Sequence, residues 1–311
     1  MFSVIFPGQG SQITGMAKEF FDNFSYVKEF FQSADELLKK NLSKIILEGP
    51  KELLDQTENT QPSIFLVSYS IFKVLEKESN LNLKQAKFYA GHSLGEYSAL
   101  CCAGSISFEK TLNLLKHRGK AMQNAVPNGE GGMVAVLGAN IDNIKKILEE
   151  NKDKYSCYIA NDNSIGQIVV SGKIDSIDYF SQDLKKNKIK YIKLPVSAPF
   201  HCPLMKNATN DMKSIILETE FKDPTHNIIS NVTAKPVSNS DQIKKLLIEQ
   251  IEKPVRWRES VLNMIGSGIN QFIEVGPGKV LSSLVKRIDR NINSNHINIL
   301  ADIKNLSNDR S

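Results

Sequence analysis

The chain has 311 residues, of which 41% are hydrophobic and 23% charged, and a chain of this length can bury a substantial core. Its 39 Lys and Arg against 34 Asp and Glu give a net charge of +5; because this excess is spread along the chain, no nucleic-acid partner is expected. No stretch approaches the roughly 20 apolar residues that span a bilayer, and the N-terminus carries no signal-peptide pattern. A soluble protein of the cytoplasm, or of the stroma-like compartment of an organelle, is therefore expected, without a membrane partner.

The four cysteines indicate neither a metal site nor a disulfide scaffold. They lack the paired spacing of a zinc site and the density of a small secreted domain, so a reducing compartment fits best. Cys101 and Cys102 lie in a predicted helix in an apolar setting, where buried and unreactive thiols are expected. The other two are Cys157 and Cys202.

Short β-type runs alternate with helical patterns along most of the chain, which indicates a parallel sheet covered by helices. The first strand is expected at 3–6, and a helix is expected over 26–40, where apolar residues recur at i, i+3, i+4 and i+7. The further elements of this part are strands at 88–90, 227–232 and 271–275, a helix that begins near Phe108, and a helix over 279–288.

Between about 126 and 195 the order changes to β-α-β-β-α-β, which is the ferredoxin-like pattern. The predicted fold is therefore α/β, with a large α/β-hydrolase-like domain over 1–125 and 196–290 and a small ferredoxin-like subdomain inserted at 126–195. Residues 291–311 are expected to form a partly disordered C-terminal extension. The cleft between the two parts is the natural place for a ligand.

A G-x-S-x-G motif at 91–95 places Ser93 between a short apolar strand and a predicted helix, the context that a nucleophile elbow requires. Gly91 and Gly95 allow a sharp turn and close helix packing because they lack Cβ atoms. The helix N-terminus offers partial positive charge to a forming oxyanion. The alternative is a tight structural turn, but the flanking strand and helix favour a nucleophile. His92 is expected to brace this turn through a hydrogen bond.

A second glycine-bearing loop, at 6–12, follows the first strand and contains Gln9 between Gly8 and Gly10. Dinucleotide binding would require G-x-G-x-x-G, and Ile13 occupies the place of the third glycine. On its own pattern, the loop is better interpreted as a structural turn than as an active element.

Together these motifs resemble the malonyl-CoA:acyl carrier protein transacylases and the related acyltransferase domains of fatty-acid and polyketide synthases. The resemblance extends from Phe6 to about Ile288. The matching runs are 6–12, 91–97, 117–119 with Met122 and Gln123, 160–172, 197–203, 254–257 and 274–278.

The resemblance implies a catalytic pair, with Ser93 as nucleophile and His201 as the base that accepts its proton and returns it to the leaving thiolate. Taken alone, a single histidine is more often structural. The family orients this histidine through a backbone carbonyl near a glutamine that matches Gln250, and no Asp claims that place. The alternative for Gln250 is a surface glutamine near a helix end.

The resemblance also assigns the oxyanion hole and the substrate contacts. The backbone N–H groups of Leu94 and Gln9 would bind the oxyanion, and Arg118 would hold the free malonyl carboxylate through a fork of two charge-assisted hydrogen bonds. Spacing alone would make Arg118 a solvated cation at a helix end. Phe200 would crowd a 2-methyl branch and so favour malonyl, unless it only packs the core.

The activity implied is that of an [acyl-carrier-protein] S-malonyltransferase of fatty-acid biosynthesis, working by a ping-pong mechanism with no metal or redox cofactor. Its partners would be malonyl-CoA and holo acyl carrier protein, and a monomer is expected. Five lysines in the run 185–193 either form a solvated surface or help to meet the acidic carrier protein. Alternative functions are transfer of another extender unit in polyketide synthesis, a serine thioesterase or hydrolase, and a non-catalytic acyl-CoA or carrier-protein binding module.

Overall fold

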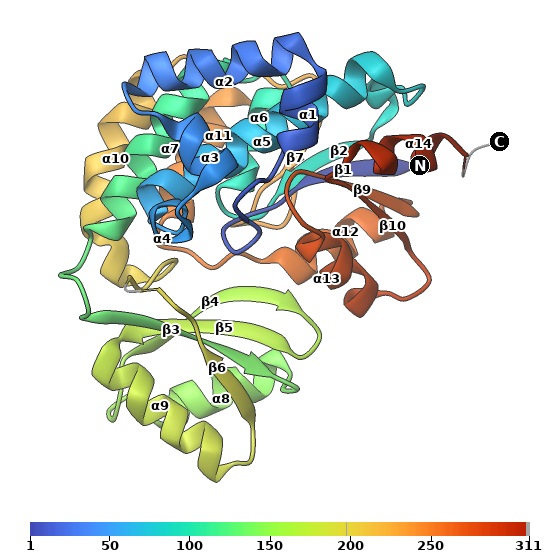
Figure 1. The fold of residues 1–311 in the computed structure, drawn as a ribbon. Coiled ribbons are helices and arrows are strands. Elements are labelled where there is room, and N and C mark those ends of the chain that lie inside the picture. Colours follow the sequence, from blue (N-terminus) through green and yellow to red (C-terminus); the bar gives the residue numbers. More distant parts are fainter. Residues whose placement is uncertain (197, 309–311) are drawn as a thin grey trace.

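The computed structural model describes residues 1–196 and 198–308. Ser197, the first residue of the run 197–203, and residues 309–311 of the C-terminal extension lie outside the described residues. The molecule has two parts, each built on one sheet (Figure 1). The chain leaves the large part once, to form the small one, and then returns.

The large part is built on a six-stranded sheet whose pairings are parallel except for the antiparallel pair at one edge. Its central strands alternate between two cores: Val4 and Phe6 belong to one hydrophobic cluster, and Ile5 belongs to another on the opposite face. Both faces are thus buried, as the parallel pairing requires. The strands, in spatial order, are β10 (Asn293–Ile297), β9 (Gln271–Val275), β1 (Phe2–Phe6), β2 (Phe88–Gly91), β7 (Asn227–Ile229) and β8 (Pro236–Val237).

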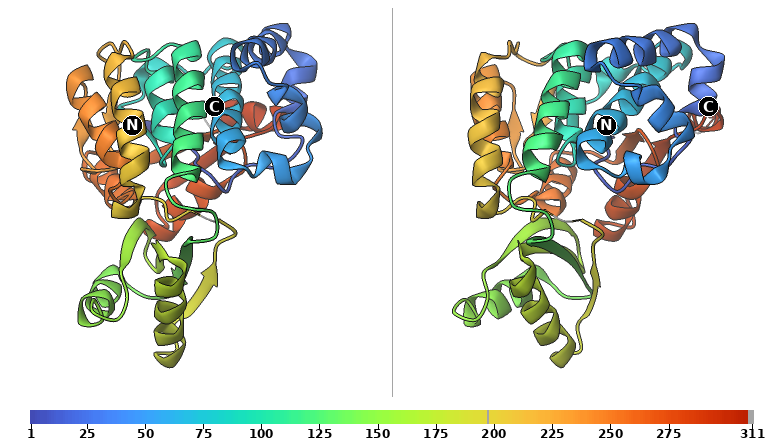
Figure 2. Two further views of the ribbon diagram at one scale, coloured as in Figure 1. Left: turned by 90° about the vertical axis from the view of Figure 1, so that its left-hand side faces the viewer. Right: turned by 60° about the vertical axis from the view of Figure 1, so that its left-hand side comes forward.

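Helices cover this sheet on both sides (Figure 2). The longest, α5, is a 22-residue helix buried along most of its length. It packs against α6, the helix that follows Ser93, and against α7, the helix that carries Arg118. Both helices are therefore held by the same neighbour. The helices are α1 (Lys18–Asn23), α2 (Ser25–Leu38), α3 (Leu42–Glu48), α4 (Lys51–Leu54), α5 (Thr57–Glu78), α6 (Gly95–Cys102), α7 (Phe108–Gln123), α10 (Lys206–Glu218), α11 (Ser240–Gln250), α12 (Trp257–Gly266), α13 (Val280–Ile288) and α14 (Leu300–Asn308), with 3₁₀ turns at Leu83–Gln85 and Pro203–Met205.

The small part is an antiparallel four-stranded sheet with two helices. Its β3 strand separates two environments, because Met133 and Ala135 join the core of the large part whereas Val134 and Val136 pack in the small core with the helices. The elements are β3 (Gly131–Leu137), α8 (Ile141–Glu150), β4 (Cys157–Ser164), β5 (Gln167–Lys173), α9 (Ile174–Lys186) and β6 (Lys190–Lys193), in the sheet order β4-β5-β3-β6.

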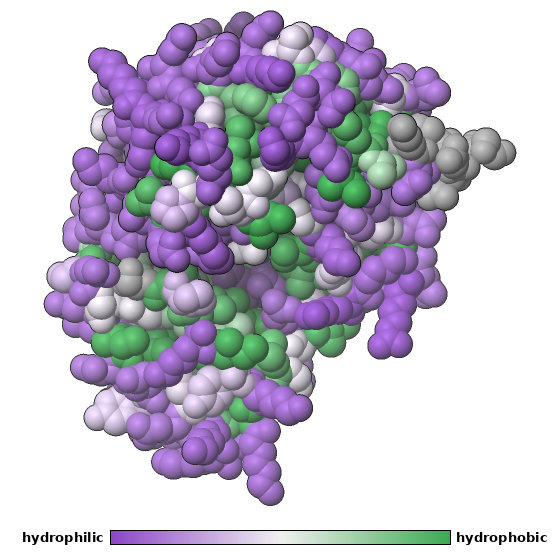
Figure 3. All heavy atoms as spheres, in the orientation of Figure 1, coloured by the Kyte–Doolittle hydropathy of each residue, from purple (hydrophilic) through white to green (hydrophobic). Residues whose placement is uncertain are grey.

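The two parts are joined at β4. Asn161 forms an isolated bridge to Val255 of the large part, and the buried Asp162 carboxylate accepts hydrogen bonds from the Arg258 guanidinium and pairs with it at 2.8 Å. The face drawn in Figure 3 is largely hydrophilic, and hydrophobic side chains appear along the boundary between the parts. None of the helices within the described residues is both long and apolar enough to cross a membrane.

The predicted strands and helices are present, with end points shifted by a few residues, and the order β-α-β-β-α-β is observed between residues 131 and 193. A mixed α/β chain with one largely parallel and one antiparallel sheet is thus confirmed. Helix α5 was not predicted. The C-terminal segment contributes the edge strand β10 and helix α14 to the large part.

Candidate active site

The turn that carries Ser93 connects β2, which ends at Gly91, to α6, which begins at Gly95. Ser93 has φ of 54°, a left-handed conformation that a non-glycine residue adopts at some cost and that is concentrated at functional sites. A Cβ atom on Gly91 would lie 1.9 Å from the Gly95 carbonyl carbon, and one on Gly95 would lie 2.3 Å from the carbonyl oxygen of Phe6. Both positions therefore require glycine, and the strand–turn–helix context expected for Ser93 is present.

Ser93 and His201 are in direct contact. The Ser93 Oγ atom lies 2.8 Å from His201 Nε2, and His201 Nδ1 lies 2.8 Å from the backbone carbonyl oxygen of Gln250. Because a carbonyl oxygen can only accept, the imidazole carries its proton on Nδ1 and leaves Nε2 free to accept the serine proton. His201 is 4% exposed and, like Ser93, has a left-handed backbone, with φ of 59°.

The imidazole is neutral in the free protein. Burial and, after it, the nearby Arg118 guanidinium lower the pKa of His201 to about 3. A neutral imidazole is the form that can act as a base. The imidazolium that forms during reaction, however, is disfavoured by the same two causes.

Arg118 lies on α7 and is completely buried, so it is not a solvated cation at a helix end. Its Nη1 donates to Gln61 Oε1 at 2.8 Å, and its Nη2 donates to Gln250 Oε1 at 2.9 Å and to Ser93 Oγ at 3.1 Å. The guanidinium therefore lies directly beside the nucleophile. Gly119 makes the close packing of α7 on α5 possible, since a Cβ there would lie 2.6 Å from the Thr57 carbonyl oxygen.

Gln250 is also completely buried, at the C-terminal end of α11. Besides its carbonyl contact with His201 and its side-chain contact with Arg118, its Nε2 donates to the Ser93 carbonyl oxygen at 3.1 Å and to Glu96 Oε2 at 2.7 Å. One residue thus contacts the nucleophile, the base and the guanidinium. The surface alternative for Gln250 does not hold.

Three residues that sequence reasoning missed, Asn231, Glu96 and Gln61, support this arrangement. Asn231, just after β7, accepts a hydrogen bond from the Ser93 backbone N–H at 2.7 Å and donates to the Gly91 carbonyl at 2.7 Å. Its own backbone N–H donates to Glu96 Oε2 at 3.0 Å. A signal for Glu96 was available, since it is the one charged residue in helix α6. Asn231 and Gln61 carry no such signal.

A cavity of about 110 Å³ opens above Ser93, and it is lined by six of the seven predicted site residues, whereas Gln250 lies behind it. The N-terminal loop reaches this cavity because Gly8 packs on the elbow, where a Cβ would lie 2.6 Å from the His92 carbonyl oxygen. Gln9 consequently lines the cavity. The six are Gln9, Ser93, Leu94, Arg118, Phe200 and His201.

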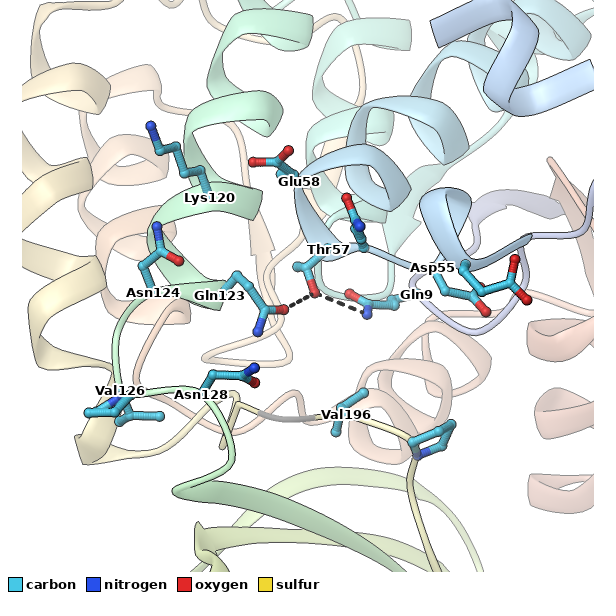
Figure 4. Close-up of a pocket in the computed structure, with 14 residues that line it drawn as sticks. Gln9, Asp55, Thr57, Glu58, Lys120, Gln123, Asn124, Val126, Asn128 and Val196 are labelled. Atoms are coloured by element: carbon cyan, nitrogen blue, oxygen red, sulfur yellow. Dashed lines mark hydrogen bonds between the residues drawn. The ribbon is translucent and has the colours of Figure 1, made fainter. Parts of the chain in front are cut away.

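A larger outer pocket of about 570 Å³ adjoins this cavity, because Gln9 and Val196 line both. Polar side chains gather around it, and the Thr57 hydroxyl accepts from Gln9 Nε2 and donates to Gln123 Oε1 (Figure 4). The outer pocket provides a polar route from the surface to Ser93.

The other residues considered from the sequence lie around the site. The Nε2 atom of His92 lies 2.8 Å from Asn163 Oδ1 of β4, which ties the elbow to the small part. The five lysines of the run 185–193 are exposed, on the end of α9, in the turn that follows it and on β6. The four cysteines are unpaired, and burial raises the pKa of Cys101 to about 12, which leaves its thiol protonated.

The chain is similar to proteins of known function along almost its whole length. Residues 3–305 match the family model of the acyl transferase domain. A malonyl CoA-acyl carrier protein transacylase of Bacillus subtilis (strain 168) is 42% identical over 290 residues, 93% of this chain and 90% of that protein. The protein of the same name from Escherichia coli (strain K12) is 38% identical over 298 residues, 96% of each chain.

Solved structures of similar proteins share the whole fold. An acyl-carrier-protein-S-malonyltransferase from Bartonella henselae superposes with a TM-score of 0.95 at 40% identity, with 98% of each chain covered. A malonyl-transacylase solved in complex with a holo acyl-carrier protein of a type II polyketide synthase superposes with a TM-score of 0.94 at 35% identity, with 99% of each chain covered.

Proposed function

The chain belongs to the acyl transferase domain family, and from this premise we propose that it transfers the malonyl group of malonyl-CoA to the phosphopantetheine thiol of holo acyl carrier protein. The reaction is a ping-pong acyl transfer of fatty-acid biosynthesis. Relatives that carry this activity in their names match nearly the full length of the chain.

In the first half of the reaction, His201 Nε2 accepts the Ser93 proton while Ser93 Oγ attacks the thioester carbon. The backbone N–H groups of Leu94 and Gln9 bind the oxyanion, a contribution of about 2.7–4 kcal/mol per donor in comparable sites. The tetrahedral intermediate collapses, CoA leaves with the proton from His201, and malonyl-Ser93 remains. The carrier-protein thiol then attacks this ester, with His201 again as base.

One observation carries the choice of acyl group: Arg118 is completely buried, and its Nη2 lies 3.1 Å from Ser93 Oγ. A malonyl group attached through its carbonyl to Ser93 has its free carboxylate two bonds away from that carbonyl. The guanidinium is therefore within reach, and it can exchange its contact with Ser93 for the carboxylate. Such pairing also reduces the positive charge that opposes an imidazolium on His201.

The two pockets support separate roles. The cavity above Ser93 has room for a three-carbon acyl group, and the outer pocket, with its amide and hydroxyl side chains, suits the amide-rich phosphopantetheine arm that malonyl-CoA and holo carrier protein share. The exposed lysines of the run 185–193 would attract the acidic carrier protein. We expect a monomer in the cytoplasm or a stroma-like compartment.

We also propose a division of the chain that matches these roles. The large domain, α/β-hydrolase-like in character, comprises 1–125 and 196–290, the ferredoxin-like subdomain comprises 126–195, and 291–311 is a C-terminal extension whose β10 and α14 pack on the large domain. The sheet order β4-β5-β3-β6 with two helices supports the description of the inserted part.

Steady-state kinetics test the function. With malonyl-CoA varied at several fixed concentrations of holo acyl carrier protein, double-reciprocal plots of CoA release should be parallel, and carrier protein without phosphopantetheine should give no transfer. Release of free malonate at the same rate with and without carrier protein would instead identify a hydrolase.

Phe200 provides a prediction about substrate range, since it is 8% exposed and lines the cavity beside His201. Phe200→Ala should raise kcat/KM for methylmalonyl-CoA relative to malonyl-CoA by about 10-fold, within the roughly 1–3 kcal/mol that one methyl group is worth in a pocket. The ratio is measured in competition assays with both thioesters. An unchanged ratio in a folded variant would show that Phe200 only packs the core.

A further inference from the structure

Behind the reacting residues lies the carboxylate of Glu96, which has no role in the reaction steps described above. Glu96 is 2% exposed and stands in the first turn of α6. It is the end of a chain of hydrogen bonds that begins at the guanidinium: Arg118 Nη2 donates to Gln250 Oε1, and Gln250 Nε2 donates to Glu96 Oε2. A buried cation and a buried anion are thus joined through one amide group.

The orientation of that amide follows from the chemistry of its neighbours. A guanidinium can only donate and an ionised carboxylate can only accept, so the Gln250 oxygen must face Arg118 and its nitrogen must face Glu96. The amide dipole is aligned between the two charges. Isolated buried charges are costly unless they are compensated, and within the described residues none of the ion pairs joins Arg118 directly to a carboxylate.

The positive charge of the site needs compensation most during the reaction. When His201 takes the Ser93 proton, a second cation forms beside Arg118, and both side chains are almost completely buried. A carboxylate already linked to this cluster stabilises that state, and it is held in place beforehand by Gln250 and by the Asn231 N–H, so no reorganisation is needed.

The charge of Glu96 does not stabilise the fold. Burial raises the pKa of Glu96 to about 7, so its ionised form is less favourable in the folded protein than in the unfolded chain, and at pH 8 the charge costs stability. A glutamine of the same shape would keep an oxygen for both donors without that cost. Groups that are retained against stability are commonly functional.

We propose that Glu96 is the counter-charge of the active site, which acts through the Gln250 amide to compensate Arg118 and the imidazolium that forms on His201. It is a positioning and electrostatic residue rather than a catalytic one, since it does not touch the reacting atoms. The proposal rests on the proposed function, in which Arg118 is the cation that selects malonyl.

The test is a double-mutant cycle at pH 8 with Glu96→Gln, Arg118→Met and the combined variant. The rate of acyl-Ser93 formation from acetyl-CoA, which brings no carboxylate of its own, is followed by rapid quench and intact mass. Glu96→Gln should slow acetylation about 10-fold in the wild-type background, within the usual range of coupling energies, and should slow it much less in the Arg118→Met background, where the imidazolium is the one cation left for the carboxylate to compensate.

The matched control is Glu274→Gln. Glu274 is as fully buried as Glu96 and accepts from the backbone N–H groups of Leu281 and Ser282 at the start of α13, without contact with Ser93 or Arg118. Its replacement should leave the acetylation rate unchanged. A similar slowing by both variants, or an equal effect of Glu96→Gln in both backgrounds, would overturn the proposal.

Thermal unfolding provides a second readout if a variant is poorly folded. Removal of the Arg118 charge leaves the Glu96 carboxylate buried and uncompensated, so Arg118→Met should lower the Tm at pH 8, and addition of Glu96→Gln should restore part of the loss; a further loss on that addition would contradict the coupling. If Arg118→Met retained the malonyl preference of the wild type, the proposed function of Arg118 would fail. If Arg118→Met lost the malonyl preference but its effects were independent of Glu96, the proposed role of Arg118 would stand and the counter-charge proposal would fail.

Discussion

Replacement of His201 by alanine is expected to slow formation of malonyl-Ser93 by about 10²–10⁴-fold, the usual contribution of a positioned general base. The physical reason is that His201 Nε2, which lies 2.8 Å from Ser93 Oγ, is the acceptor for the serine proton. Among the residues that line the cavity, the one other imidazole is that of His92. That imidazole is engaged with Asn163. Single-turnover mixing of protein and malonyl-CoA, quenched in acid and analysed by mass, measures the rate.

His92→Ala serves as the comparison for this variant. It removes a partly buried imidazole of the same cavity, whose hydrogen-bond partner is Asn163 and not the Ser93 hydroxyl, so it should affect acylation far less than His201→Ala. A loss below 10-fold in folded His201→Ala, or equal losses in the two variants, would contradict the assignment of His201 as the base.

Replacement of Arg118 by methionine is expected to lower kcat/KM for malonyl-CoA by about 10²–10⁴-fold, because two hydrogen bonds to a carboxylate contribute about 1.5–3 kcal/mol each. Acetyl-CoA makes neither bond. Its kcat/KM should therefore fall much less, and the removal of a cation beside His201 favours the imidazolium. Competition between the two thioesters, scored by the masses of the acyl-Ser93 adducts, measures the change in selectivity.

Arg118→Lys separates charge from geometry in the same assay. A lysine keeps one positive charge but cannot form the fork of two parallel hydrogen bonds, so it should recover only part of the malonyl preference. Full recovery would mean that charge alone selects the substrate. An unchanged preference in Arg118→Met would mean that selection lies elsewhere in the cavity.

The parts of the site that follow local rules were predictable from the sequence. The elbow at Ser93 depends on Gly91 and Gly95, which are close in sequence, and the flanking strand and helix have clear patterns. The position of Arg118 shows the limit of such rules. Spacing alone placed it at a solvated helix end, whereas the resemblance to a family placed it at the substrate, and its complete burial excludes the first interpretation.

The hydrogen bonds behind the site could not be predicted, because they join residues that are far apart in the sequence. Glu96 meets Gln250 and Asn231 across 154 and 135 residues, respectively, and no periodicity specifies which buried amide faces which buried carboxylate. Helix α5 was not predicted either, for a different reason. It is buried nearly all round and contains Pro62 and many small polar residues, so it lacks the apolar stripe by which a surface helix is recognised.

The central claim is that Ser93 carries the malonyl group between two thiols. Intact mass spectrometry of the protein after brief exposure to malonyl-CoA tests it most directly, with Ser93→Ala in parallel and holo acyl carrier protein added afterwards. We expect one malonyl adduct on Ser93, absent from the variant and discharged on addition of the carrier protein, which gains the same mass. An adduct that persists in Ser93→Ala, or a wild-type protein that forms none, would contradict the claim.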